Sequence, residues 1–406
     1  MSPFSTVNWL IGSSVSALGV GFLAVISQSL GAKNRELAVR LSGQSVLVTF
    51  VVGIFFTVIT LSLSPFVPAL MQVDASIRDI AAKYFFILYT PMLFRSASII
   101  FGSILRAAGD SKTPMVVGLL VNAVNVFLNF ILIYPTRDVT VGDNTLTVFG
   151  ADMGVVGAAA ASAVAYTLGG IVITVALFRH KVISPKKIPA RFDGEVLRPC
   201  LKIALPNMLQ RFGTSLGYVV FASMINSLGE IATAAHTIAN TVESAFYIPG
   251  YGMQAAAATL TGNAEGAGDR QRIRDLARIL TFIEVLLMII SGGLLFIFAP
   301  QMMSLFSKDA EVISLGSTVL KMVALSEPVY GVSIIIEGML QGQGNTKTPF
   351  KFNIIGMWGI RIAGTFICIV FLGLGLISAW ACMIAHNVLL FVMFTIYYNK
   401  KLTDRK

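Results

Sequence analysis

A stretch of twelve residues has a second, similar copy in this chain, and this repeat constrains the fold more than any other feature. The first copy covers residues 104–115 and the second covers residues 339–350. Gly109 in the first copy aligns with Gly344 in the second, 235 residues later. The same spacing relates two other pairs of stretches: 31–34 with 266–269, and 6–7 with 241–242. We therefore expect two related halves, which is a common plan among transporters.

Each copy ends one apolar run and begins another. The junction reads Gly-Asp-Ser-Lys-Thr-Pro in the first copy and Gly-Asn-Thr-Lys-Thr-Pro in the second. Gly commonly follows the last turn of a helix, and Pro fits the first turn of the next helix. The pattern predicts a tight connection between two helices at the same place in each half.

The composition indicates a membrane protein. Hydrophobic residues make up 55% of the 406 residues and charged residues 12%, whereas a soluble protein has about twice that share of charge. A spanning helix needs about 20 mostly apolar residues. We predict an all-α polytopic membrane protein with about eleven transmembrane helices. Their expected extents are 6–30, 41–63, 80–106, 114–134, 154–178, 201–227, 232–263, 279–299, 313–341, 350–372 and 376–398.

The loops between these runs alternate in charge. One set contains 22 Lys and Arg residues, whereas the opposite set contains four: Arg78, Lys83, Arg137 and Lys308. The positive-inside rule places the first set, and with it the C-terminus, in the cytoplasm of a prokaryotic cell. The net charge of +10 lies in these loops, so it does not indicate a nucleic-acid partner.

The repeat predicts two pseudo-symmetric lobes around a central cavity. We expect an N-terminal lobe of five helices at 1–180, a cytoplasmic linker at 181–200 and a C-terminal lobe of six helices at 201–406. We expect the basic residues of the linker to reflect membrane topology, because cytoplasmic loops are rich in Lys and Arg. A binding site for lipid headgroups is the less favoured alternative. The helix at 201–227 has no partner in the first half at the repeat spacing. We therefore expect that the first helix of the first lobe is missing, through a start codon assigned too late.

Signatures of enzymes and metal sites are absent or weak. Cys200, Cys368 and Cys382 do not have metal-ligand spacing, and no P-loop pattern occurs. Residues 213–217 fit G-x-S-x-G, but they lie within an apolar helical run, where small residues favour helix packing. An intramembrane protease using His236 or His386 is a remote alternative. We expect no enzyme, no metal and no cofactor, apart from H⁺ or Na⁺ as a coupling ion.

A charged side chain within a membrane indicates a functional or structural role, because burying one there costs about 2.5–3.5 kcal/mol. His236, Asn240, Glu243 and Tyr247 are spaced to share one helix face. Glu243 is the leading candidate to carry a proton, bind Na⁺ or attract a cationic substrate. The alternative is a structural Glu that is hydrogen-bonded to its neighbours.

Four further charged residues follow in the second half, and three of them, Glu327, Glu337 and Arg361, are candidates for transport or ion coupling. Glu327 is a second candidate for contact with an ion or substrate. We expect Arg361 to form an ion pair with Glu327 or Glu337 that holds two helices together. Glu284 is expected near a helix end.

The first half contributes amides rather than acids. Asn125 and Asn129 are expected on one face of the helix at 114–134, as ion-coupling candidates or as interhelical hydrogen-bonding groups. Arg95 is the charged group expected inside this half.

The stretch from Leu105 to Pro114 resembles the inter-helix loop of the MATE (multidrug and toxic compound extrusion) transporters, and the second copy resembles the same loop of their C-terminal lobe. Further similarities cover nearly the whole chain, at residues 28–34, 234–239, 262–269 and 358–361. The resemblance implies antiport of H⁺ or Na⁺ against small amphipathic or cationic organic compounds by alternating access. Some members place a carboxylate at the Asn129 position and an acid on the first helix. This chain lacks both, so that ion mechanism does not carry over.

The expected partners are a small organic substrate and the lipid bilayer, and we expect a monomer. A lipid-linked oligosaccharide flippase of related architecture is the alternative, because Arg95, Arg211 and Arg361 would suit phosphate groups. A membrane scaffold protein without transport activity is a weaker alternative. The sequence leaves the substrate and the coupling ion open.

Overall fold

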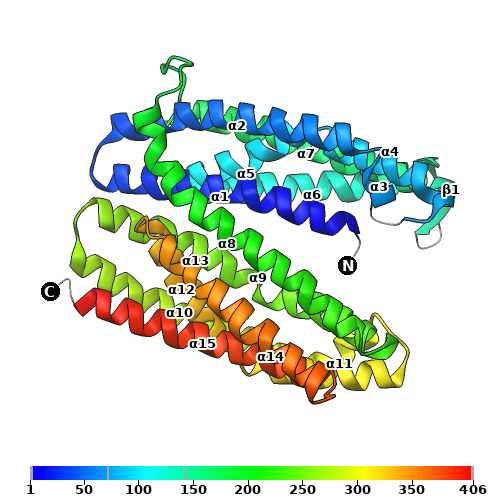
Figure 1. Ribbon diagram of the computed structural model, residues 1–406. Helices are drawn as coiled ribbons and strands as arrows, with labels where there is room; N and C mark the ends of the chain where they lie inside the picture. Colours follow the sequence, from blue (N-terminus) through cyan, green and yellow to red (C-terminus); the bar gives the residue numbers. More distant parts are fainter. Residues whose placement is uncertain (1–2, 71–72, 142–143, 404–406) are drawn as a thin grey trace. The chain divides into compact units, whose positions relative to one another are not determined.

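The computed structural model describes residues 3–70, 73–141 and 144–403. Long helices dominate it, and one two-stranded hairpin interrupts them (Figure 1). In chain order the elements are α1 Pro3–Gly31, α2 Arg35–Leu63, α3 Val67–Leu70, η1 Ala75–Ile77, α4 Arg78–Tyr89, α5 Met92–Ala107, α6 Lys112–Leu132, β1 Pro135–Val141, β2 Asn144–Ala151, α7 Gly154–Arg179, α8 Gly194–Asn226, α9 Glu230–Gly266, α10 Arg270–Ser304, α11 Ala310–Ala324, α12 Glu327–Gly342, α13 Lys347–Ile354, η2 Ile355–Ile362, α14 Ala363–Phe366, η3 Ile367–Phe371 and α15 Leu376–Thr403.

Every stretch expected to span the membrane is mostly helical, and two of them, 80–106 and 313–341, are each divided into two helices. Among the described residues, seven helices are long and apolar enough to cross a membrane, and two bent helix pairs bring the number to nine. Helices α8 and α9 are not among them, since polar residues such as Gln210, Arg211 and Glu243 interrupt their apolar runs. The prediction of an all-α polytopic membrane protein is confirmed, whereas the count of eleven stays a prediction.

Three local departures from continuous helix were not expected. Helices α4 and α5 are bent by 44° and α11 and α12 by 54°, at breaks that carry or adjoin Pro91 and Pro328. The expected loop after α6 is an antiparallel hairpin in which Arg137 pairs with Val148. The expected helix at 350–372 contains two π-helical segments, η2 and η3. Such π-helical turns occur frequently at functional sites.

The chain forms two compact units. The N-terminal unit contains residues 3–22 and 35–199, and the C-terminal unit contains residues 23–34 and 200–403. Helix α1 therefore contributes to both units. The expected division into lobes at 1–180 and 201–406 stays a prediction.

In the N-terminal unit, α5 packs against α2 and α7, and α7 also packs against α4 and α6. The contact between α5 and α7 is close because of Gly170. A Cβ atom at Gly170 would lie 2.5 Å from the Phe94 backbone oxygen. Small residues that let helix backbones approach in this way are typical of membrane bundles.

In the C-terminal unit, α12 is the central helix. It packs against α9, α10 and α15, and its side chains Ile335, Met339 and Leu340 are fully buried. Gly342 lies so close to α9 that a Cβ atom would be 2.1 Å from the Ala258 oxygen. The polar groups on these helices are therefore held in a rigid, close-packed frame.

The end of α1 docks on α9 and α12 through contacts that follow the sequence repeat. A Cβ atom at Gly31 would lie 1.9 Å from the Asn263 oxygen, and one at Gly266 would lie 1.9 Å from the Gln28 oxygen. Gly266 and Asn263 are the repeat equivalents of Gly31 and Gln28, so the contact is reciprocal. The Gln28 amide also donates to the Gly342 carbonyl at 2.7 Å.

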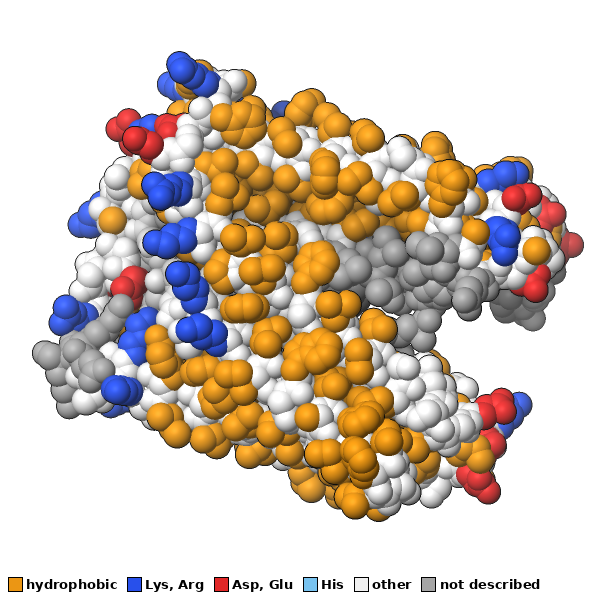
Figure 2. Space-filling view, viewed as in Figure 1, with side chains coloured by type: hydrophobic (Ala, Val, Ile, Leu, Met, Phe, Trp, Pro, Cys, Tyr) orange, Lys and Arg blue, Asp and Glu red, His pale blue; other side chains and the backbone are white. Residues whose placement is uncertain are grey.

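In both units Lys and Arg gather at one end of the helices, and Asp and Glu are prominent at the other (Figure 2). Apolar side chains cover the surface between the two ends (Figure 2). On α2, for example, Phe50, Phe55 and Val58 are each more than half exposed. This pattern suits helices whose outer faces contact lipid. The orientation expected from the positive-inside rule stays a prediction.

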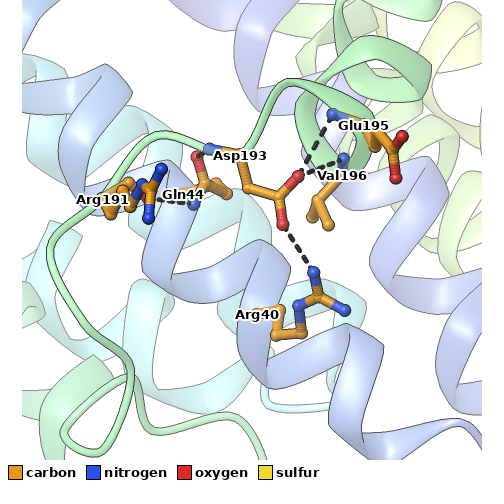
Figure 3. Close-up of polar contacts among 6 residues, drawn as sticks. All are labelled: Arg40, Gln44, Arg191, Asp193, Glu195 and Val196. Atoms are coloured by element: carbon orange, nitrogen blue, oxygen red, sulfur yellow. Dashed lines mark hydrogen bonds and ion pairs between the residues drawn. The ribbon is translucent and has the colours of Figure 1, made fainter.

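The basic linker after α7 is fastened to α2 within the N-terminal unit (Figure 3). Asp193 and Arg40 form an ion pair at 2.5 Å. Gln44 donates to the Arg191 carbonyl and accepts from the Asp193 backbone N–H. The other carboxylate oxygen of Asp193 accepts from the backbone N–H groups of Glu195 and Val196, at the start of α8. Asp193 therefore joins α2 to the first turn of α8.

We expect Asp193→Ala to speed tryptic cleavage after Lys186 and Lys187 several-fold at neutral pH, because the linker loses its tie to α2. The bond from Arg40, aided by the backbone N–H groups, holds the pKa of Asp193 below its usual range. A lowered carboxyl pKa stabilises the fold above the unfolded value of about 3.9, and this stabilisation is lost as the pH falls through the folded pKa. Protection of residues 181–199 from hydrogen exchange, measured relative to the intrinsic rate of the unfolded chain at each pH, should therefore be high at neutral pH and fall below about pH 4.

Asp193→Asn separates the two contributions, because it keeps the bonds to the helix start and loses the charge. It should give an intermediate rate of cleavage. Glu195→Gln is the matched control, since it neutralises the neighbouring exposed acid. Equal cleavage rates in Asp193→Ala and Glu195→Gln would show that the linker is held by other contacts.

Candidate functional site

The four polar residues expected on one face of α9 lie along one continuous helix. Pro249 follows them within α9. Glu243 is buried, with 7% of its surface exposed, while His236, Asn240 and Tyr247 are half-buried. The structure therefore places the leading carboxylate in the interior of the C-terminal unit.

Three buried carboxylates from three helices lie in this unit. They are Glu243 on α9, Glu284 on α10 and Glu327 at the start of α12. Glu327 is 2% exposed and lies within electrostatic reach of both other carboxylates. One oxygen of Glu327 is buried with no hydrogen-bond partner among the described residues. Acidic groups placed in this way inside a membrane protein mark ion pathways and binding sites.

Glu284 was expected near a helix end, and that expectation is wrong. It lies in the middle of α10 and is fully buried. Neither of its carboxylate oxygens has a partner among the described residues. Its niche exists because Gly250 and Gly331 lack side chains, since a Cβ atom at Gly250 would be 2.6 Å from the carboxylate. The signal available in the sequence was a single acid, the sixth residue of the apolar run 279–299.

Tyrosine side chains lie beside the carboxylates. The Tyr247 ring contacts the Tyr251 and Tyr330 rings at centroid distances of 5.6 and 6.4 Å. The hydroxyls of Tyr251 and Tyr330 are 3.3 Å apart. Tyr247 is also within electrostatic reach of Glu243 and Glu327. Ring faces next to carboxylates are a combination that attracts organic cations.

Arg361 lies in the π-helical segment η2, and the expected ion pair is wrong. Among the described residues it pairs with neither Glu327 nor Glu337. Its guanidinium carbon lies 5.0 Å from the Tyr218 ring centroid and 4.8 Å from that of Phe221. The charge of Arg361 still acts on Glu243, so it contributes to the field at the carboxylates.

Glu337 is engaged by amides instead. It accepts hydrogen bonds from Gln210 at 2.9 Å, Gln341 at 3.0 Å and Asn353 at 3.1 Å. Gln210 lies on α8, Gln341 on α12 and Asn353 on α13. Glu337 therefore joins α8, α12 and α13 through partners other than the expected Arg361, and an ion-coupling role for it stays a prediction.

The two histidines expected inside this half lie in packed surroundings. The His236 ring lies between Phe221 and Trp380, at centroid distances of 5.6 and 5.8 Å. His386 is buried, and a Cβ atom at Gly356 would be 2.4 Å from its ring. Ser215, the Ser of the G-x-S-x-G pattern, lies within helix α8, and Gly213 and Gly217 of that pattern pack on Ile354 and Met357. The pattern therefore reflects helix packing.

In the N-terminal unit the two asparagines are linked to each other. Asn129 donates to Asn125 at 3.1 Å, and Asn125 donates to the Ser162 hydroxyl at 3.0 Å. The second bond joins α6 to α7, as expected for interhelical hydrogen bonding. An ion-coupling role for these two residues stays a prediction.

An apolar groove of about 630 Å³ lies between α8 and η2 in the C-terminal unit. Val219, Met224, Trp358 and Phe366 line it, and Ser223 supplies a hydroxyl. Several of its lining side chains are more than a third exposed, and neither the three carboxylates nor the three tyrosines are among its lining residues.

Comparison with known proteins agrees with this arrangement. The MatE family profile matches residues 1–131 and 206–367. The probable multidrug resistance protein NorM of Thermotoga maritima is 26% identical over 94% of this chain and 80% of its own length. The probable multidrug resistance protein YoeA of Bacillus subtilis is 24% identical over 100% of this chain and 87% of its own length.

Solved structures share the fold. A MATE transporter in the bent conformation superposes with a TM-score of 0.88 at 21% identity, over 99% of this chain and 87% of its own. A MOP superfamily transporter from Pyrococcus furiosus, described as having a binding pocket of reverse polarity, gives a TM-score of 0.90 at 22% identity, with the same coverage. Because the MatE profile covers well over half of the residues and the fold agrees, this chain is a transporter of the MatE family.

Proposed function

We propose that this protein exports small amphipathic or cationic organic compounds across the cell membrane by antiport with H⁺ or Na⁺, through alternating access. The observation that carries the proposal is the group of three buried carboxylates in the C-terminal unit. The multidrug resistance proteins among the relatives support the export of organic compounds. The chain requires no cofactor beyond the coupling ion and works as a monomer, with its C-terminus in the cytoplasm.

Glu243 and Glu327 carry the coupling ion in this proposal. A carboxylate that is shielded from water binds a proton or Na⁺ on one side of the membrane and releases it on the other. The Tyr247, Tyr251 and Tyr330 rings hold the cationic part of the substrate, because ring faces attract organic cations. Competition between the ion and the substrate for the same carboxylates couples the two movements.

The membrane potential supplies enough energy for such exchange. One charge that crosses 100 mV gains about 2.3 kcal/mol, which supports a gradient of about 50-fold. Exchange of one monovalent cation for one proton moves no net charge, however, and the potential then contributes nothing. The stoichiometry of exchange therefore decides how steep a substrate gradient the protein can sustain.

Ethidium efflux from proteoliposomes containing the full chain tests the proposal. We expect efflux when a proton gradient or a sodium gradient is imposed alone, and the gradient that works identifies the coupling ion. Liposomes without protein are the control. Absence of efflux under both gradients, for ethidium and several other dyes, would contradict the proposal.

The alternative, a lipid-linked oligosaccharide flippase, rests on buried arginines. Arg211 is held by Asn207 at 3.0 Å and lies near Glu337, and Arg361 lies over aromatic rings. Both therefore have partners within the C-terminal unit. The remaining arginine, Arg95, lies near the Tyr166 ring in the N-terminal unit.

A further inference from the structure

Two cysteine side chains meet in the C-terminal unit. Cys368 lies in the π-helical segment η3, and Cys382 is the seventh residue of α15. Their Sγ atoms are 3.8 Å apart. Both cysteines are free, and both side chains are half-buried. Neither residue belongs to the carboxylate and tyrosine groups of the proposed function.

Helix packing and a short connection hold the two thiols in this arrangement. Residues 372–375 lead directly from η3 to α15, and the Leu374 N–H donates to the Cys368 carbonyl at 2.9 Å. Helix α15 packs against both η3 and α14. A Cβ atom at Gly364 of α14 would lie 3.1 Å from the Cys382 sulfur, so α15 approaches closely because this side chain is missing. The two sulfur atoms therefore face each other from elements of fixed spacing.

The surface around the two thiols is apolar. Ile367 and Val370, on either side of Cys368 in η3, are 50% and 57% exposed. The stretch 362–398 contains no Asp, Glu, Lys or Arg. Exposed apolar side chains of this kind on a membrane-spanning helix contact lipid. A compound that reaches the pair must therefore dissolve in the bilayer, and a product that carries a net charge is disfavoured there.

This environment discriminates among the reactions that are open to two neighbouring thiols. A disulfide requires an oxidant that accepts two electrons, which the exchange of ions and organic compounds does not supply. A soft monovalent cation such as Cu⁺, held by two thiolates, would leave a net negative charge in apolar surroundings. A trivalent arsenical with one organic group bonds two thiols through a single arsenic atom, and both the compound and its product are neutral.

We propose that Cys368 and Cys382 form a dithiol site that captures apolar trivalent arsenicals through one arsenic atom. When an arsenoxide, R–As=O, meets the two thiols, two As–S bonds form, and the two S–H bonds and the As=O bond break. Both protons leave with the oxygen as one molecule of water. Arsenic stays trivalent, so the step needs no oxidant or reductant. The product ties η3 to α15 through its two As–S bonds.

Phenylarsine oxide binding to the full chain in nanodiscs of neutral lipid tests the site. The protein is reduced first, and intact mass spectrometry then counts the phenylarsenic groups on each chain. We expect one group per chain, and we expect the number of thiols open to alkylation in the unfolded protein to fall from three to one. The label should survive excess 2-mercaptoethanol and be removed by 2,3-dimercaptopropanol, because an arsenic atom held at two points is displaced by another dithiol.

Cys200→Ala is the matched control, because it removes the third cysteine, which is buried and lies in α8. It should bind phenylarsine oxide as the unmodified protein does. Cys368→Ala and Cys382→Ala each leave one thiol of the pair. The concentration needed for half-maximal labelling should then rise at least about 100-fold, since the second bond is lost. The remaining label should be removed by 2-mercaptoethanol.

Three results would overturn the site. They are a chain that binds no phenylarsenic group, a label that 2-mercaptoethanol removes from the unmodified protein, and labelling that is lost in Cys200→Ala but kept in Cys368→Ala. If a variant of the pair does not fold, as judged by gel filtration, the unmodified protein decides through the contrast between the two thiol reagents. Peptide mapping of the label to 363–399 would support the site independently of the variants.

Discussion

Ion-driven ethidium efflux from proteoliposomes should fall at least about tenfold when Glu243 is replaced by Gln. The amide keeps the size of the side chain, but it cannot carry a proton or neutralise a cation. Glu243 is the carboxylate of α9 that lies within reach of Glu327, Tyr247 and Arg361. Initial rates under the gradient that drives the unmodified protein measure the effect.

Glu230→Gln is the control for this experiment, because it makes the same change in the first turn of the same helix. It should transport at the normal rate. Melting temperatures of both variants must match that of the unmodified protein, so that a loss of efflux reflects coupling and not folding. Unchanged efflux in Glu243→Gln would exclude Glu243 as the coupling residue and leave Glu327 as the principal candidate.

The positions of the helices could be predicted from the sequence because membrane helices obey a simple physical rule. A run of about 20 apolar residues must form a helix, since its backbone groups have no other partners in lipid. The end of each run was visible in its Gly and Pro residues, as at Gly109 and Pro114. The repeat also predicted a relation that appears in the packing, where Gly31 and Gly266 make equivalent contacts.

The distances between side chains on different helices could not be predicted in this way. Arg361 was expected to meet a carboxylate because both were charged and lay on successive helices. In the structure two aromatic rings lie next to Arg361 instead, and three amide groups donate hydrogen bonds to Glu337. Pairing depends on how helices rotate about their axes, and that rotation is set by the packing of whole faces. The periodicity of residues along one helix does not determine this rotation.

The same limit explains why Glu284 was missed. Its importance comes from two glycines on other helices, Gly250 and Gly331, which leave room for a carboxylate. A single residue in an apolar run gives no sign of such a niche. Pro91 and Pro328 lie at or beside the two bends, but Pro249 and Pro300 lie inside continuous helices, so the donor that Pro lacks does not by itself decide which helix bends. Each bend also brings a charged residue, Arg95 or Glu327, to a place where the helix is interrupted.

Glu284 and Glu337 should respond to the same substitution with opposite changes in stability. Glu337→Met leaves three amide donors without their acceptor, and we expect it to destabilise the protein by about 2 kcal/mol or more and to lower the melting temperature in detergent by several degrees. Glu284→Met removes a fully buried carboxyl group that has no partner among the described residues, and we expect the melting temperature to rise. Met is chosen because it is unbranched and close to Glu in length, which suits a position beside Gly250 and Gly331.

A rise in stability at Glu284 should be accompanied by slower ion-driven efflux, because a carboxyl group that weakens the fold is retained where function needs it. Glu284→Gln, which keeps the shape and removes the charge, should show the same loss of efflux with a smaller change in melting temperature. If Glu284→Met instead lowered the melting temperature as much as Glu337→Met, the Glu284 carboxyl would have to be bound to a group within the folded protein. It would then be a structural residue like Glu337, and the coupling site would consist of Glu243 and Glu327.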